Sequence, residues 1–294
     1  MATYKTYDTI GIREDLQDAI YDISPTTTPF MSTVGRTKAK NTYHEWQTDS
    51  LADVNLANAQ IEGADAVSAT LTPTTRVGNY TQISDKVIQV STTDDVVDKA
   101  GRSTETAYQL SKASAEIKRD MESILLSDQA QDAGGTATPR KLGGLASWLT
   151  TNTVNTAGGA LTEDMLKEAV LKAYNSGGEP DVLLVSPANK QVVSTFAGIA
   201  EQRYQAPKSS PTTIIGAADV YLSDFGSVSV VPDRFLSDDF SYVLDPSMAS
   251  VAYLRPFKSQ KLAKTGDSEK HLLNVEYTLV VNNEAAHAMM SDET

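Results

Sequence analysis

Two strand-like segments enclose a stretch that cannot form a hydrophobic core, and this feature limits the possible folds most. From 41 to 92 the chain sets aromatic and β-branched residues among threonine and glutamine, as strands do. The middle, residues 50–75, carries only scattered large apolar residues: Leu51, Val54, Leu56, Ile61, Val67 and Leu71. An isolated two-stranded hairpin is marginal in water, so a long one must lie against another surface. We therefore predict an extended hairpin at 41–95.

A long amphipathic helix is predicted to follow at 102–132. Its apolar residues recur at helical spacing on one side: Leu110, Ala113, Ile117, Met121, Ile124 and Leu125. Ser103 is expected to cap the first turn, and the glycine pair at 134–135 is expected to end the helix. Because further glycine pairs occur at 143–144 and 158–159, we expect residues 136–159 to form an irregular, mobile loop.

A compact module is predicted from residue 161 onward. Thr162 can cap a helix that ends at Gly177, a buried strand spans 181–185, and Ser186-Pro187 begins another helix. Further strand-like segments lie at 220–222, 228–231, 242–244, 250–254 and 272–281. Helices and strands are clustered and do not alternate, so the predicted fold class is α+β.

The composition excludes several classes of protein. With 294 residues of which 40% are hydrophobic, the chain can bury a substantial core, and with no cysteine it forms no disulfide. Its longest apolar runs are far shorter than a bilayer requires, so we expect no membrane contact. The first 16 residues lack the apolar core of a secretory signal, so we expect the chain to stay in the cytoplasm where it is made. The net charge of -13 leaves only loose contact with nucleic acid.

No residue pattern predicts catalysis, a cofactor or a metal. His44, His271 and His287 fit no paired metal-ligand spacing. Ser147 lacks the second glycine of a nucleophile elbow, and the glycine pairs do not match a phosphate-binding loop. The acidic doublets at 94–95 and 238–239 are expected in solvated turns. We therefore predict that the protein is not an enzyme.

The charged residues fall into two segregated groups. Four cations recur every third residue without an acid between them: Arg255, Lys258, Lys261 and Lys264. The N-terminal arm, residues 1–40, is predicted to be a short helix followed by extended chain, and its first part carries acids that include Asp15 and Asp18. The cations are either solvated or part of an interface strip that meets this acidic arm between subunits. Trp46 and Trp148 are expected to be packed interface residues.

The order of these parts resembles the Hong Kong 97 type major capsid fold of tailed double-stranded-DNA bacteriophages over nearly the whole chain. Several short segments are more specifically similar to a podophage-type capsid family, in matching order: 23–30 (ISPTTTPF), 44–49 (HEWQTD), 62–65 (EGAD), 76–83 (RVGNYTQI), 108–113 (YQLSKA) and 118–120 (KRD).

The resemblance implies a division into five parts. These are an N-terminal arm at 1–40, an extended loop at 41–95, a peripheral domain with a spine helix and glycine-rich loop at 96–160, an axial domain at 161–250, and C-terminal strands at 251–294 that return to the peripheral domain. The implied function is that of a structural subunit that forms hexamers and pentamers of an icosahedral phage head around the double-stranded DNA. The residues predicted at the subunit interface are Trp46, Leu51, Val54, Leu56, Ile61, Arg255, Lys258, Lys261, Asp15 and Asp18.

The resemblance also implies partners and a location. Besides itself, the chain is expected to contact a portal protein, scaffolding and decoration proteins and, loosely, the packaged DNA. It is expected in the virion after assembly in the host bacterial cytoplasm. Two alternatives remain open: the shell protein of a cellular nanocompartment, which would package enzymes, and a minor phage structural protein or adhesin, which would form soluble trimers.

Overall fold

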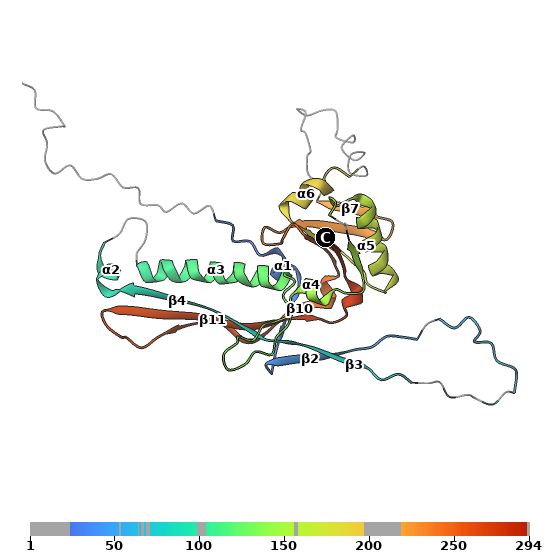
Figure 1. Cartoon of the computed structure of the whole chain (residues 1–294), viewed down its shortest axis with the longest axis horizontal. Helices are drawn as coiled ribbons and strands as arrows, with labels where there is room; N and C mark the ends of the chain where they lie inside the picture. Colours follow the sequence, from blue (N-terminus) through green and yellow to red (C-terminus); the bar gives the residue numbers. More distant parts are fainter. Residues whose placement is uncertain are drawn as a thin grey trace, which may run out of the picture.

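A computed structural model describes residues 24–52, 54–63, 65, 68, 71–98, 104–155, 158–196 and 219–292. The described strands form a four-stranded sheet, a six-stranded sheet and a two-stranded hairpin (Figure 1). Helices and strands are clustered along the chain, which confirms the α+β class. Among the helices of these ranges, none has the length and apolar character needed to span a bilayer.

The four-stranded sheet is long and narrow, and one helix runs along it (Figure 1). Its strands, in order across the sheet, are β1 (Gly35–Lys38), β10 (Ala249–Lys261), β11 (Ser268–Val281) and β4 (Gln82–Ser91). β1 is parallel to β10, whereas the other neighbours are antiparallel. Helix α3 (Glu105–Leu126) contacts β4 and β11. Its apolar face, which includes Ile117, Met121 and Leu125, is buried in one core with Val275 and Tyr277 of β11.

Helix α3 is shorter than the predicted 102–132. Residues 101–103, with the predicted cap Ser103, lie outside the described residues, and the side chain of Thr104 caps the helix by accepting the N–H of Ala107 at 3.4 Å. The helix ends at Leu126, well before the glycine pair, and the carbonyl of Leu126 accepts the hydroxyl of Tyr242 at 2.6 Å. The next residue, Ser127, is extended and donates its hydroxyl to the carbonyl of Ile124. These contacts satisfy carbonyls that the helix end would otherwise leave unpaired.

The six-stranded sheet lies between two layers of apolar side chains. Its strands, in order, are β5 (Thr153–Asn155), β12 (Ala288–Ser291), β9 (Phe240–Leu244), β6 (Val182–Val185), β8 (Gly226–Pro232) and β7 (Val220–Ser223). Leu183 and Val185 of β6 pack with helix α5 (Glu163–Asn175) and with Val193 at the end of α6 (Pro187–Val193). Val182 and Leu184 on the other face belong to the core that contains α3. The two sheets therefore share a core.

The hairpin is shorter than predicted. β2 (Tyr43–Thr48) pairs with β3 (Thr75–Tyr80), and β4 does not continue this pairing but joins β11 in the four-stranded sheet. The prediction of one hairpin over 41–95 is therefore wrong for 82–91. Both arrangements give the same alternation of apolar and polar residues, so the sequence pattern does not separate them.

Three other segments also differ from prediction. Residues 136–159 are not wholly irregular, because helix α4 (Leu145–Trp148) and β5 lie within them, and Leu142, Leu145 and Leu149 are buried. The C-terminal segment does not return as a whole to the four-stranded sheet, because β12 pairs with β9 and β5. The part of the arm predicted to be extended contains helix α1 (Pro29–Thr33). Short 3-10 turns lie at Pro246–Met248 and Glu284–Ala286.

The acidic doublet at 94–95 lies in helix α2 (Thr92–Val96) instead of a solvated turn. Asp95 accepts the backbone N–H and the hydroxyl of Thr106, at 3.1 and 3.2 Å. The carboxylate of Asp95 therefore connects α2 to the first turn of α3.

We expect Asn79 of β3 to be essential for subunit stability. Its side chain is fully buried; it donates to the carbonyls of Gly143 and Leu279 at 3.0 and 2.9 Å and accepts the N–H of Gly143 at 2.8 Å. Asn79→Ala leaves these groups unpaired and should lower the free energy of unfolding by roughly 3 kcal/mol in denaturant titration. Asn55 is exposed, and its side chain accepts the N–H of Ala57. Asn55→Ala should therefore leave the free energy of unfolding nearly unchanged. Equal effects of the two substitutions would contradict the role of Asn79.

Candidate functional site

The tip of the hairpin, between β2 and β3, carries a row of exposed apolar side chains. Beyond β2 and β3 the chain extends away from both sheets (Figure 1). The predicted interface residues here are almost completely exposed: Leu51 (98%), Leu56 (97%), Val54 (87%) and Ile61 (82%). Leu71 is exposed to 90% as well, whereas Val67 lies outside the described residues. Exposed apolar side chains on a segment with no core of its own indicate that another molecule covers the segment.

The root of the hairpin is held by aromatic side chains within the same chain. The ring of Trp46 packs against that of Trp148 with centroids 5.4 Å apart, and Tyr43 and Tyr80 pack at 4.5 Å. Gly78 permits this pairing, because a Cβ there would lie 2.8 Å from the side chain of Glu45. The structure thus gives Trp46, predicted at the subunit interface, an intrachain partner.

A buried carboxylate joins the hairpin root to the four-stranded sheet. Glu276 of β11, only 4% exposed, accepts the hydroxyl of Thr81 at 2.8 Å, Nη2 of Arg140 at 2.5 Å and Nε of Arg255 at 2.7 Å. Burial alone would raise the pKa of Glu276, but the hydrogen bond from Thr81 and the charges of Arg255 and Arg140 lower it below its usual value. Glu276 therefore stays ionised and bridges two cations.

The predicted basic strip is largely neutralised by the neighbouring strand. Arg255 pairs with Glu276, and Lys261 pairs with Glu269 at 2.7 Å. Lys258 is exposed and forms no ion pair with a described residue. Both acids lie on the neighbouring strand β11, and the spacing of the cations along the sequence does not predict this pairing. The predicted acidic partners Asp15 and Asp18 lie outside the described residues.

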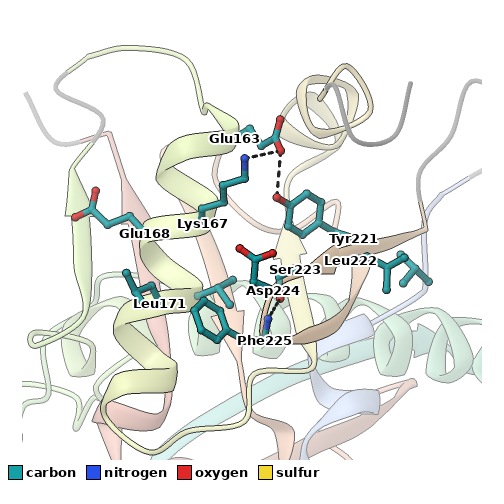
Figure 2. Close-up of a pocket in the computed structure, with 11 residues that line it drawn as sticks. Glu163, Lys167, Glu168, Leu171, Tyr221, Leu222, Ser223, Asp224 and Phe225 are labelled. Carbon is teal, nitrogen blue, oxygen red and sulfur yellow. Dashed lines mark hydrogen bonds and ion pairs between the residues drawn. The ribbon is translucent and has the colours of Figure 1, made fainter. Parts of the chain in front are cut away.

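A pocket of about 380 Å³ opens between α5 and the edge strand β7. Figure 2 shows Glu163 between Lys167 and Tyr221, with Leu171 and Phe225 nearby. Glu163 accepts Nζ of Lys167 at 2.9 Å and the hydroxyl of Tyr221 at 3.3 Å. Burial and, next, the charge of Glu163 raise the pKa of Tyr221, so this tyrosine stays neutral. The pocket thus combines an ion pair with an apolar wall.

The three histidines lie on different elements. His44 is in β2, His271 is in β11, and His287 is buried, with Nδ1 accepting the N–H of Asp245 at 3.1 Å. Burial lowers the pKa of His287, which favours the neutral ring. Within the described ranges, no cluster of three or more histidine and acidic side chains could hold a metal ion.

Comparison with known proteins gives matches over nearly the full chain. The sequence model of the SU10 major capsid protein family matches residues 2–294. The major capsid protein of Escherichia phage Phieco32 is 29% identical over 340 aligned positions, which cover 98% of this chain and 96% of that protein.

Solved structures of low sequence identity share the fold. A structure from Mycobacterium phage Adephagia has a TM-score of 0.67 at 12% identity and covers 100% of this chain and 99% of that chain. The capsid of a native GTA particle gives 0.65 at 10% identity, with 98% of each chain covered. The holo-SrpI encapsulin complex from Synechococcus elongatus gives 0.62 at 13% identity, with 96% of each chain covered.

We predict that Glu276→Gln destabilises the subunit in a pH-dependent manner. The neutral amide weakens the hydrogen bonds from both arginines, so the free energy of unfolding at pH 7 should fall by about 2–3 kcal/mol. The pKa of Glu276 is lowered from its ordinary value of 4.5 in the folded state. Its contribution to stability is therefore complete above pH 4.5 and is lost as the pH falls below that value. The difference between wild type and variant in denaturant titration should therefore shrink in acid.

Glu269→Gln on the same strand is the matched control for this prediction. Glu269 is partly exposed to solvent and pairs with Lys261, so its removal should have a small effect that added salt abolishes. A difference for Glu276→Gln that stays constant from pH 7 to strong acid would exclude the proposed charge pairing.

Proposed function

This chain belongs to the SU10 major capsid protein family and is a phage major capsid protein, a structural subunit of the virion and not an enzyme, and we propose that its hairpin tip joins neighbouring subunits of the shell. The supporting observation is the row of almost fully exposed apolar side chains at the tip, which includes Leu51, Leu56 and Leu71. Covering one such side chain contributes about 1.5–3 kcal/mol.

The shape of the tip supports a head-to-tail contact between subunits. The tip extends away from the body of its own subunit, so it can reach over the body of a neighbour (Figure 1). Contacts between unlike surfaces close into rings when the rotation between subunits permits. We propose that these rings are the hexamers and pentamers of an icosahedral head that encloses the double-stranded DNA.

We propose that the two sheets correspond to the two main domains of the capsid fold. The four-stranded sheet with α3 would be the peripheral domain, and the six-stranded sheet with α5 and α6 would be the axial domain. The boundaries at 40, 95, 160 and 250 remain predictions. The strand pairing supports two changes to them, because β4 belongs with the peripheral sheet and β5 and β12 with the axial sheet.

Further partners follow from the role of a phage head. We propose contacts with a portal protein and with scaffolding and decoration proteins, and assembly in the host bacterial cytoplasm. The net charge of -13 supports no more than loose contact with the packaged DNA. A nanocompartment shell remains the alternative with some structural support, because the encapsulin complex shares the fold at 13% identity. The family match favours the phage capsid. DNA in purified particles would decide for the phage capsid, and a packaged enzyme would decide for the alternative.

Removal of the tip should separate folding from assembly. Replacing residues 49–74 by Asn-Gly should leave β2 and β3 joined by a tight turn. Because the described residues of the tip are exposed and belong to no core cluster, we expect an unchanged melting temperature but no shells by electron microscopy. Leu51, Leu56 and Leu71 replaced together by serine should have the same effect, whereas exposed Asn55 and Gln60 replaced by serine should not. An unfolded deletion variant would place the tip in the intramolecular core.

Lys258 should contribute to assembly through the acidic arm of an adjacent subunit. Arg255 and Lys261 have partners within the chain, so Lys258 is the cation of the strip that supports this contact best. Lys258→Glu should raise the protein concentration needed for assembly at low salt, and high salt should remove the difference, because exposed pairs are screened.

Deletion of residues 1–23 supplies the control for Lys258. In the truncated chain Lys258→Glu should no longer change the assembly threshold, because its partner is gone. If Lys258→Glu shifts the threshold equally with and without the arm, the cation has a different partner.

A further inference from the structure

Two buried carboxyl groups meet where three parts of the subunit join. Glu122 lies on α3, and Asp233 directly follows β8 of the six-stranded sheet. Neither side chain has any exposure to solvent. The third part is α1, which lies within the N-terminal arm and is the first helix of the described residues. Capsid assembly as proposed above uses neither carboxyl group.

Glu122 caps α1 from a distant position in the sequence. Its Oε1 accepts the N–H of Phe30 at 2.6 Å, and its Oε2 accepts the N–H of Met31 at 3.0 Å. Thr28, at the cap position of α1 itself, supplies no side-chain hydrogen bond. The first N–H groups of a helix have no partner within the helix, so α1 depends on Glu122 for this. Phe30 and Met31 are buried beside α3, so the cap fixes the root of the arm to that helix.

Asp233 has one oxygen that lacks a hydrogen-bond donor. Its Oδ1 accepts the N–H of Phe235 at 2.8 Å, whereas its Oδ2 is buried and accepts from no described residue. The Asp233 carboxyl lies within hydrogen-bonding reach of the Glu122 carboxyl. Two ionised carboxylates in such a place repel each other, whereas a single proton between them gives the free oxygen a partner.

The surroundings favour retention of that proton. The guanidinium of Arg119 lies over the ring of Phe235, 5.4 Å from its centroid, and neither carboxyl forms an ion pair with a described residue. Tyr253 of β10, itself near Arg36, is a further titratable group that interacts with Glu122. Burial and then the charge of Asp233 raise the pKa of Glu122 to about 8, although the two backbone N–H groups lower it. Burial also raises the pKa of Asp233.

We propose that a proton shared by Glu122 and Asp233 acts as a switch, which holds α1 and the root of the N-terminal arm on α3 while it is bound and releases α1 when it is lost. The bound proton connects α3 to the six-stranded sheet through one hydrogen bond, while the N–H groups of Phe30 and Met31 hold α1 on Glu122. Its loss leaves two adjacent negative charges in a site without solvent. Release of α1 then admits water to Glu122 and relieves the repulsion.

The direction of the pH dependence follows from the raised pKa. When release of α1 exposes Glu122 to water, its pKa returns to the ordinary value of 4.5, whereas in the docked form its pKa is about 8. Docking of α1 on α3 is therefore strongest at and below pH 4.5, weakens as the pH rises, and is weakest above pH 8. Within this window the docking equilibrium falls by up to about tenfold per pH unit.

Amide hydrogen exchange of the full-length protein tests the switch directly. The backbone N–H groups of Phe30 and Met31 exchange only when they leave Glu122. Their protection, corrected for the intrinsic pH dependence of exchange, should fall at least about tenfold between pH 6 and pH 8.5. Protection of the central turns of α3 in the same sample should change much less. Equal corrected protection of Phe30 and Met31 at the two pH values would overturn the proposal.

Two substitutions isolate the shared proton. Asp233→Asn supplies an amide donor to Glu122 and removes the repulsion, so protection of α1 should be high at both pH values. Glu122→Gln cannot ionise, so protection should be lower but independent of pH. Asp238→Asn, an exposed acid in the same loop, is the control and should keep the wild-type pH dependence. A wild-type pH dependence in both Asp233→Asn and Glu122→Gln would show that a different group titrates.

Discussion

The packing of α3 against β4 and β11 is the contact on which the rest of the subunit depends. It buries Ile117, Met121 and Leu125 in one core with residues of β11, and each such side chain contributes about 1.5–3 kcal/mol. The surface ion pairs of the chain are worth much less. The same helix positions Glu122 for the cap of α1. At its end, the carbonyl of Leu126 accepts the hydroxyl of Tyr242 from the six-stranded sheet. The arm and the second sheet are therefore both oriented by α3.

Local signals were sufficient to predict several elements. The cap at Thr162 is confirmed, because its side chain accepts the N–H of Met165, and β6 is buried as its run of apolar residues predicted. The apolar face of α3 is also confirmed. Each of these features depends on residues within a few positions of one another, which is the range over which periodicity and capping patterns act.

Contacts between distant segments could not be predicted in the same way. The pairing of β4 with β11, the partner of Arg255 and the meeting of Glu122 with Asp233 all depend on which strands become neighbours in space. The surroundings of a buried acid also decide its ionisation. Glu276 meets two arginines and stays charged, whereas Glu122 meets another acid and retains a proton. The residue type is the same in both cases, so the sequence alone does not distinguish these two outcomes.

A single residue, Thr81, separates the hairpin strand β3 from β4 of the main sheet. Its N–H donates to the carbonyl of Thr42, its hydroxyl donates to Glu276, and its carbonyl accepts Nε of Arg140. A neighbour that pulls on the hairpin tip therefore applies tension along β4, whose register with β11 runs from Gln82 to Ser91. Tension along a strand loads its hydrogen bonds in shear, so they must break together and cannot peel apart singly. In the proposed shell the hairpin would therefore be a tether anchored along the long axis of the sheet, suited to resist outward pressure on the wall.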